Sequence, residues 1–204
     1  NKLPLVIKAN GLKENKNEVI KIKRWVEDFL GRPSENAYYF KYDLIILPRI
    51  DGGLSPCRHR LSVREMDELR QEDKDIFQEY KEYLCNDFPD DTKIKNGFLY
   101  YCNSWKNTFF ISPYGRLKFC VHSDKYSVDL RVTPFREGFY AMCQKLLNEK
   151  FKADSECRGC SLRGICYSCP AVASLEGKNE ESPVEYFCRL SKHIAGQMRD
   201  VSRI

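Results

Sequence analysis

The 204-residue sequence predicts an α+β protein in two parts. Up to about residue 90, apolar runs of strand length alternate with amphipathic helical patterns, which is typical of parallel α/β structure. Beyond residue 90 the pattern changes to short strands, one helix and a stretch in which cysteines replace regular periodicity. We therefore predict two domains, residues 1–90 and residues 91–204.

The first domain should begin with a strand, a helix and a second strand. Residues 3–9 (LPLVIKA) form a branched apolar run that fits a buried parallel strand. The run at 37–49 predicts a second strand, closed by Pro48 and by the turn at 51–53. Between them a helix is indicated by apolar residues at helical spacing and a C-terminal glycine: Val19, Ile22, Val26, Phe29 and Gly31.

A further helix closes the first domain. Ser62 and Glu65 form a capping-box pattern, which predicts a helix start at that point. Apolar residues then continue at helical spacing to Leu84. Two strands cannot complete an α/β sheet, so we expect the chain to be a piece of a longer protein that supplies the rest.

The second domain should begin with a hairpin followed by a helix. Residues 107–111 and 116–120 read as short strands on either side of the turn at 112–115. This hairpin would bring the thiols of Cys102 and Cys120 toward each other. A helix is expected at about 135–150, with these residues on one face: Phe139, Met142, Cys143, Leu146 and Leu147.

Ten cysteines are the unusual feature of the composition. Four of them lie in residues 156–170 (ECRGCSLRGICYSCP), which we call the four-cysteine segment, with the spacing C-x2-C-x5-C-x2-C. Disulfides are one interpretation, but pairs of thiols only two residues apart favour metal or cluster ligation. Cys85 and Cys143 lie on helical apolar faces, where we expect them to be small buried hydrophobes.

Charge and hydropathy argue against a nucleic-acid-binding protein and against a membrane protein. A net charge of +5 without a dense basic stripe argues against nucleic-acid binding. The sequence contains no apolar run of membrane-spanning length and opens with no signal peptide, so we expect no membrane partner and a cytoplasmic location.

The complete cysteine spacing resembles a known family. Cys102, twelve residues, Gly115, four residues and Cys120 precede the four-cysteine segment, and Cys188 follows it. This pattern is similar to the SPASM domain of radical S-adenosylmethionine enzymes, over residues 100–190, although the last interval of the segment is two residues rather than three. The pattern of 1–90 resembles the last two strand units of these enzymes' partial (β/α)6 barrel.

The resemblance implies two auxiliary [4Fe–4S] clusters with interleaved ligands. Cys102, Cys120 and Cys169 would hold the first cluster. The second would be held by Cys157, Cys160, Cys166 and Cys188. A final cysteine that reaches the other cluster and precedes a proline, as Cys169 precedes Pro170, also occurs in two-cluster ferredoxins.

Several alternatives stay open at this point. The fourth ligand of the first cluster is either absent, leaving an open iron site, or is Cys57; His122 is left outside the ligand set. Thiolates also suit zinc, so the main rival interpretation is a structural or binding module with two zinc sites. In a chain prepared in air, the cysteines could also hold zinc, stay empty or form disulfides. A ferredoxin-like electron-transfer domain is a third interpretation, although it would need no α/β lead.

The resemblance also implies a function. The parent would be a radical S-adenosylmethionine oxidoreductase, in particular a peptide maturase, that abstracts hydrogen from a peptide or protein substrate. Its electron donor would be a ferredoxin or flavodoxin. These 204 residues contain no C-x3-C-x2-C loop for the catalytic third [4Fe–4S] cluster and S-adenosylmethionine, so we expect this chain alone to be inactive. Val121, where anaerobic sulfatase maturases have Asp, counts against that particular activity.

Overall fold

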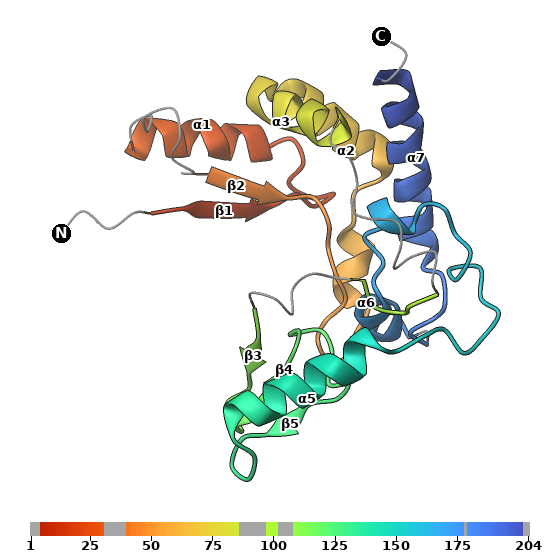
Figure 1. Ribbon diagram of the computed structural model, residues 1–204. Helices are drawn as coiled ribbons and strands as arrows, with labels where there is room; N and C mark the ends of the chain where they lie inside the picture. The colour runs from red at the N-terminus through yellow and green to blue at the C-terminus, as the bar shows by residue number, and fades with distance from the viewer. Residues whose placement is uncertain (1–4, 31–39, 86–96, 102–107, 178, 202–204) are drawn as a thin grey trace. The chain divides into compact units, whose positions relative to one another are not determined.

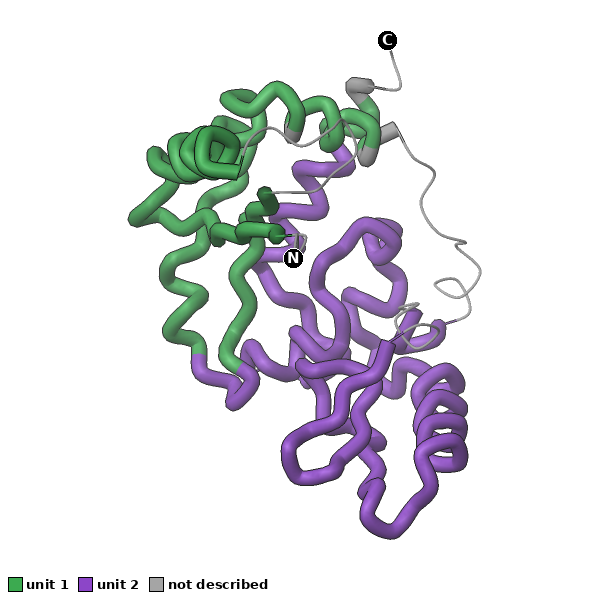
Figure 2. Tube along the Cα trace, turned by 90° about the vertical axis from the view of Figure 1, so that its left-hand side faces the viewer, with its two compact units in different colours: residues 1–49, 54–86, 197–204 green, residues 50–53, 87–196 purple. Residues whose placement is uncertain are grey.

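The computed structural model describes residues 5–30, 40–85, 97–101, 108–177 and 179–201. These residues form an α+β fold, as predicted, and the chain divides into two compact units (Figures 1 and 2). Unit 1 comprises residues 1–49, 54–86 and 197–204, and unit 2 comprises residues 50–53 and 87–196. The change of unit at 86/87 lies close to the expected boundary at 90. No helix among the described residues has both the length and the apolar character needed to cross a membrane.

Unit 1 contains a two-stranded parallel sheet. Strands β1 (Ile7–Asn10) and β2 (Phe40–Asp43) pair in register from Ile7 with Phe40 to Asn10 with Asp43, so the parallel pairing is confirmed. The prediction of a buried first strand was wrong for the described part, because β1 alternates between half-buried and exposed residues. Helix α1 packs against one face of this pair (Figure 1).

Helix α1 (Val19–Leu30) forms where the sequence predicted a helix, but it turns a different face inward. Val19 and Val26 are fully buried as expected, whereas Phe29 is 68% exposed and stacks on Trp25 with ring centroids 5.4 Å apart. The buried face includes Lys23, whose ammonium group pairs with the buried carboxylate of Asp73. Gly31, the expected cap, lies outside the described residues.

The predicted helix after the capping box is two helices. The box itself is confirmed: the Glu65 amide donates to Ser62 Oγ, and the Ser62 amide donates to the Glu65 carboxylate at 2.8 Å. However, α2 (Val63–Glu72) ends at Asp73 and α3 (Lys74–Cys85) begins after it. Asp73 has extended backbone and accepts hydrogen bonds from Lys23 Nζ at 2.8 and 2.9 Å. This buried ion pair holds α1 against the junction of the two helices.

Unit 2 contains a small antiparallel sheet covered by a helix. The predicted hairpin is confirmed in β3 (Phe110–Ile111) and β4 (Arg116–Lys118), and β5 (Val128–Asp129) adds a third strand that was not predicted. Gly115 has φ +74° in the connecting turn, a conformation that glycine adopts without strain. Residue 107 and Cys102 lie outside the described residues.

The predicted helix at 135–150 is α5 (Phe135–Leu147), which packs on β4 and β5. Its inner face contributes Met142, Cys143 and Leu146 to a core completed by the sheet and by residues 99, 100, 119 and 151. Cys143 is 5% exposed, which confirms its role as a small buried hydrophobe.

The region from 151 to 188 is more regular than expected. A short 3-10 helix, η3 (Arg163–Ile165), lies within the four-cysteine segment, and α6 (Pro170–Leu175) begins directly after it with Pro170 at its first position. Helix α7 (Glu185–Val201) begins before Cys188. Its fully buried residues recur at helical spacing: Phe187, Leu190, Ser191 and Ile194.

Candidate metal centre

Successive tight turns shape the four-cysteine segment. The Cys160 amide donates to the Cys157 carbonyl at 3.4 Å, the Arg163 amide to the Cys160 carbonyl at 3.3 Å, and the Cys166 amide to the Arg163 carbonyl at 3.2 Å. Each turn reverses the chain within three residues, so cysteines that are several positions apart stay close in space. Tyr101 adds a long-range contact, since its hydroxyl donates to the Arg163 carbonyl at 2.6 Å.

Cys188 is associated with three of these cysteines, Cys157, Cys160 and Cys166, although it is twenty-two or more positions away from them in sequence. It lies in the first turn of α7, where its amide donates to the Val184 carbonyl at 3.0 Å. Burial raises the pKa of the Cys157 thiol to about 11, and the thiolates of Cys188, Cys166 and Cys160 add to this shift. Burial likewise raises the pKa of Cys188, and Cys166 and Cys160 add to it. Cys188 is therefore linked electrostatically to Cys157, and both are linked to Cys160 and Cys166.

Cys169 has a different neighbourhood. It is the N-cap residue of α6, and its thiolate contributes to the raised pKa of Tyr100, after burial and the Glu180 and Glu149 carboxylates. The Tyr100 ring packs edge-on against Phe119, with centroids 5.5 Å apart. Phe119 directly precedes Cys120. Cys120 thus packs against the core that holds the Tyr100–Phe119 pair, and Cys169 acts on Tyr100 electrostatically.

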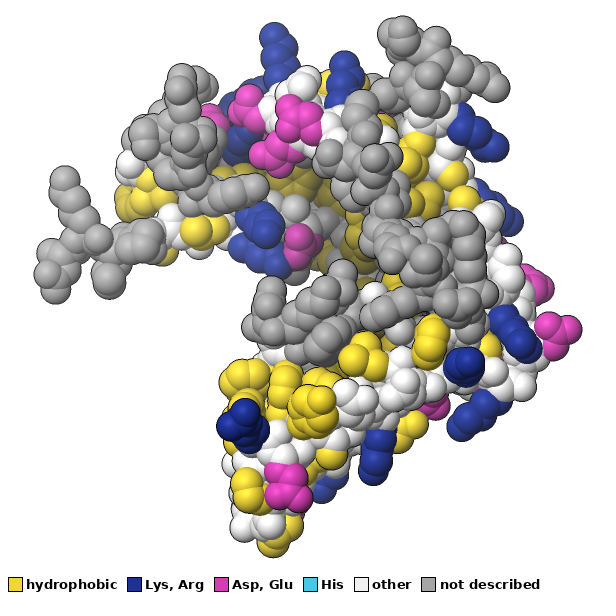
Figure 3. All heavy atoms as spheres, viewed as in Figure 1, with side chains coloured by type: hydrophobic (Ala, Val, Ile, Leu, Met, Phe, Trp, Pro, Cys, Tyr) yellow, Lys and Arg dark blue, Asp and Glu magenta, His cyan; other side chains and the backbone are white. Residues whose placement is uncertain are grey.

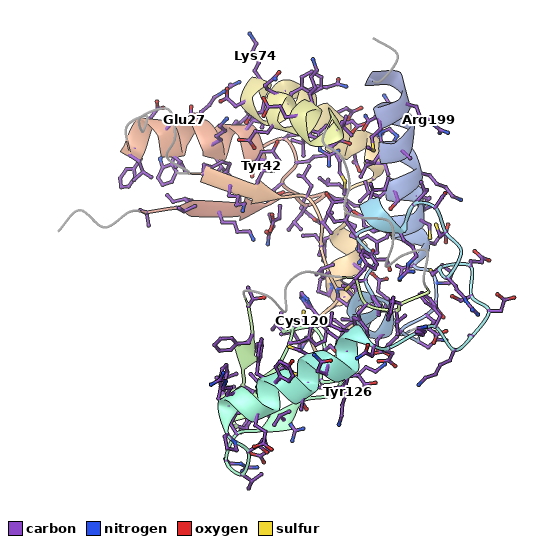
Figure 4. The ribbon with its side chains drawn as sticks, viewed as in Figure 1. Glu27, Tyr42, Lys74, Cys120, Tyr126 and Arg199 are labelled. Atoms are coloured by element: carbon purple, nitrogen blue, oxygen red, sulfur yellow. The ribbon has the colours of Figure 1, made fainter. Side chains whose placement is uncertain are left out.

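Cys120 itself is half-buried at the edge of the α5 core and lies beside α5 (Figure 4). Its Sγ is 3.7 Å from His122 Nδ1. Burial lowers the pKa of His122, so this imidazole is neutral near pH 7 and can accept or donate a hydrogen bond at the thiol. Cys102, the remaining predicted ligand, lies outside the described residues.

Cys57 and Cys85 belong to unit 1. Cys57 lies in η1 (Ser55–His59), where its amide donates to the Leu54 carbonyl at 3.0 Å. Cys85 is the last residue of α3, and its side chain is outside the described part. The structure therefore places all the described ligand candidates except Cys57 in unit 2.

A partly buried polar network that includes Tyr100 was missed by the sequence reasoning. Lys125 Nζ binds the carboxylates of Glu149, at 2.8 Å, and Glu180. The Tyr100 hydroxyl donates to Glu180 at 2.8 Å, and the Tyr126 hydroxyl donates to Glu149 at 2.8 Å. Tyr126 has φ +56°, an uncommon conformation for a bulky residue. The network ties four separate stretches of unit 2 together.

Arg163 is the second group that the sequence did not reveal. It is 5% exposed, and its Nη2 donates to the carbonyls of Phe98 at 2.8 Å and Leu99 at 3.0 Å. Its Nη1 is buried and has no hydrogen-bond partner among the described residues. Burial lowers the pKa of Arg163, whereas negative charge on Tyr101 and on the thiolates of Cys157, Cys160 and Cys166 opposes that shift.

The donor set suits a group that requires thiolate ligands. Within the described residues, three or more His, Cys, Asp or Glu side chains are nowhere arranged to hold a single metal ion. Beyond burial, the thiolates of Cys188, Cys166 and Cys160 nevertheless raise the pKa of Cys157, and those of Cys166 and Cys160 raise the pKa of Cys188. A bound cation or cluster would relieve the repulsion among four thiolates, as metal binding does whenever it displaces thiol protons.

Comparison of the chain with protein-family models, with curated proteins and with solved structures gives no significant match.

Proposed function

We propose that unit 2 holds two [4Fe–4S] clusters through a crossed ligand set. Cys157, Cys160, Cys166 and Cys188 bind the second cluster. Cys102, Cys120 and Cys169 bind the first, whose fourth iron is left open. When bound, such clusters supply one-electron transfer, and an open iron can take a substrate group.

The proposal rests on the cysteine spacing and on the surroundings of two described thiols: beyond burial, the thiolates of Cys188, Cys166 and Cys160 raise the pKa of Cys157, and those of Cys166 and Cys160 raise the pKa of Cys188. Cys188 is remote in sequence from the four-cysteine segment, yet it acts on Cys157 more strongly than the other two thiols do. Cys169 lies within the segment but acts on Tyr100, which packs on the residue before Cys120. This division of the thiols supports the crossed set over a contiguous four-cysteine site.

The wider role follows from the cysteine spacing. We assign the chain to the auxiliary-cluster portion of a radical S-adenosylmethionine enzyme that modifies a peptide or protein by hydrogen abstraction. The catalytic cluster and S-adenosylmethionine belong to a longer parent, because the 204 residues contain no C-x3-C-x2-C motif. The electron donor of the parent would be a ferredoxin or flavodoxin.

Native mass spectrometry of the anaerobically purified chain tests the cofactor assignment. The expected spectrum carries the added mass of two four-iron clusters. A chain that carries two zinc ions after the same handling would replace the proposal with a zinc-stabilised structural module, since zinc also binds four thiolates. An unloaded chain would argue against both.

A further inference from the structure

Strand β3 is the outer strand of the sheet in unit 2. The strand order is β3–β4–β5, so among the described residues β3 pairs with β4 alone. The Ser112 amide donates to the Arg116 carbonyl at 2.9 Å, which makes these two residues a hydrogen-bonded pair. Bonded and non-bonded pairs alternate along an antiparallel ladder, so Ile111 and Leu117 form a non-bonded pair. The N–H and C=O of Ile111 therefore point away from β4, toward the outer edge of the sheet.

The apolar side chains at this edge are exposed. Helix α5 packs on β4 and β5, and Leu117 of β4 is fully buried. Ile111, directly opposite Leu117 on β3, is 44% exposed. Phe109, which precedes β3, is 52% exposed and packs edge-on against Phe135 and Phe139 of α5, with ring centroids 5.0 and 6.2 Å away. We call the surface formed by Phe109, Ile111, Phe135 and Phe139 the β3–α5 surface; hydrophobic side chains gather there in Figure 3.

An outer strand of this kind is normally protected. Soluble proteins place charged side chains, proline or a covering element at such edges, because free backbone groups beside apolar side chains attract another strand. Both residues of β3, Phe110 and Ile111, are uncharged. Exposed apolar patches of this kind mark interaction sites. A strand edge adds a direction to the patch, since an extended peptide can pair with the backbone and pack its side chains at the same time.

The charges around the β3–α5 surface indicate the chemistry of such a peptide. Arginines outnumber carboxylates on the flanking segments: Arg116, Arg131 and Arg136 against Asp129 and Glu137. Arg131 pairs with Asp129, whereas Arg116 donates to the uncharged hydroxyl of Ser127 at 3.2 Å. Lys118 pairs with Asp124 at 2.6 Å, so this pair adds no net charge. The excess of positive charge favours a partner that carries carboxylates.

We propose that the β3–α5 surface binds an extended acidic peptide by strand addition. The peptide pairs with the N–H and C=O of Ile111 and packs alternate apolar side chains against Phe109 and Phe135. Its carboxylates meet the arginine excess around the surface. The inference goes beyond the cluster assignment and does not rest on it, because the surface contains none of the cysteines.

Fluorescence anisotropy of the full wild-type chain with four labelled eight-residue peptides tests the proposal. The first peptide alternates Phe or Val with Glu, and the second has the same composition in scrambled order. The third is the first peptide N-methylated throughout, so it keeps its side chains but has no backbone donor. The fourth has Lys in place of Glu. We expect saturable binding of the first peptide, about tenfold weaker binding of the second and third, and about threefold weaker binding of the fourth.

Three variants locate the binding site. Ile111→Lys adds to β3 the kind of charge that protects natural edge strands, and Phe109→Ala removes the ring that packs on α5. Each should weaken binding of the first peptide about tenfold. Ile50→Lys is the matched control, since Ile50 is 58% exposed in unit 2 but precedes Gly52, which lies near the Leu175 carbonyl of α6. This control should change binding less than twofold.

Several results would overturn the proposal. They are the absence of saturable binding, equal binding of the first and third peptides, binding of the fourth as tight as that of the first, or equal effects of Ile111→Lys and Ile50→Lys. The peptide series uses the wild-type chain, so it decides the matter even if a variant does not fold. Sedimentation equilibrium identifies the competing occupant: a wild-type dimer that Ile111→Lys abolishes, in a chain that binds no peptide, would assign this edge to a second copy instead.

Discussion

Cys188→Ala tests whether α7 supplies the fourth ligand of the cluster that we assign to Cys157, Cys160 and Cys166. Cys188 is half-buried in the first turn of α7, and alanine has the highest helix propensity, so the helix should persist without the thiol. The fully ligated cluster would lose one of its four thiolates. We expect reconstituted Cys188→Ala to retain about four of about eight irons, since each cluster holds four.

The metal-free chain gives an independent magnitude for the same contact. Burial and the thiolates of Cys188, Cys166 and Cys160 raise the pKa of Cys157 to about 11, and Cys188 is the largest contributor among the thiolates. Cys188→Ala should therefore lower the pKa of Cys157 toward its ordinary value. Thiolate ultraviolet absorbance, followed against pH in the variant and in wild type, measures this shift.

Variants of two other cysteines complete the test of the ligand assignment. Cys169→Ala should remove the EPR signal of the other cluster, although Cys169 lies within the four-cysteine segment. Cys143→Ala is the control: its side chain is 5% exposed in the α5 core, so the variant should keep both clusters and lose about 1–2 kcal/mol of stability. The crossed assignment is refuted if Cys169→Ala and Cys188→Ala lose the same signal, which would indicate a contiguous four-cysteine site.

Two further predictions concern unit 1. Asp73→Ala should lower the free energy of unfolding by about 3–5 kcal/mol in chemical denaturation, because it leaves Lys23 buried without its main partner; the same change at Asp75, whose side chain is 78% exposed, should cost much less, and equal costs would contradict the role of burial. The hydrogen bond from Lys16 is the main cause that lowers the pKa of Glu65 to about 2. The stability that this bond contributes is present above pH 4.5 and is lost as the pH falls toward 2. Wild type should therefore be more stable than Glu65→Gln by about 1 kcal/mol at pH 7, and acid denaturation should show this difference narrowing between pH 4.5 and 2. A difference in stability that stays constant over this range would contradict the reasoning.

Local signals in the sequence predicted local structure well. The capping box at Ser62 and the turn at Gly115 depend on residues only a few positions apart, and both occur as predicted. The break between α2 and α3 was not predictable in this way. It occurs at Asp73, which is buried because Lys23, fifty positions earlier, pairs with it. Helical periodicity runs through this residue and does not reveal the pair.

The same distinction applies to the candidate site. The four-cysteine segment is visible as a spacing, because its turns join residues three positions apart. The residues that surround this segment in the fold cannot be recognised from the sequence. Arg163 contacts the Leu99 carbonyl across 64 positions, and Tyr100 contacts Glu180 across 80. Arginine and glutamate at such positions read as ordinary surface residues in a chain with 31% charged residues, and only the fold buries Arg163 and half-buries Glu180.

Exposed aromatic side chains of unit 2 are a further feature that the sequence did not indicate. Phe109 packs edge-on against Phe135 with centroids 5.0 Å apart, and both rings are more than 40% exposed. Hydrophobic side chains cover this end of β3 and α5 in the view of Figure 3. The helical pattern of α5 predicted its buried face correctly, but it carried no information on this second apolar surface.

Iron and acid-labile sulfide per chain, measured after anaerobic reconstitution, test the central claim most directly. Two [4Fe–4S] clusters predict about eight irons and about eight sulfides in each wild-type chain. Bound zinc with no labile sulfide, after the same anaerobic treatment, would contradict the assignment of unit 2 as an iron–sulfur domain.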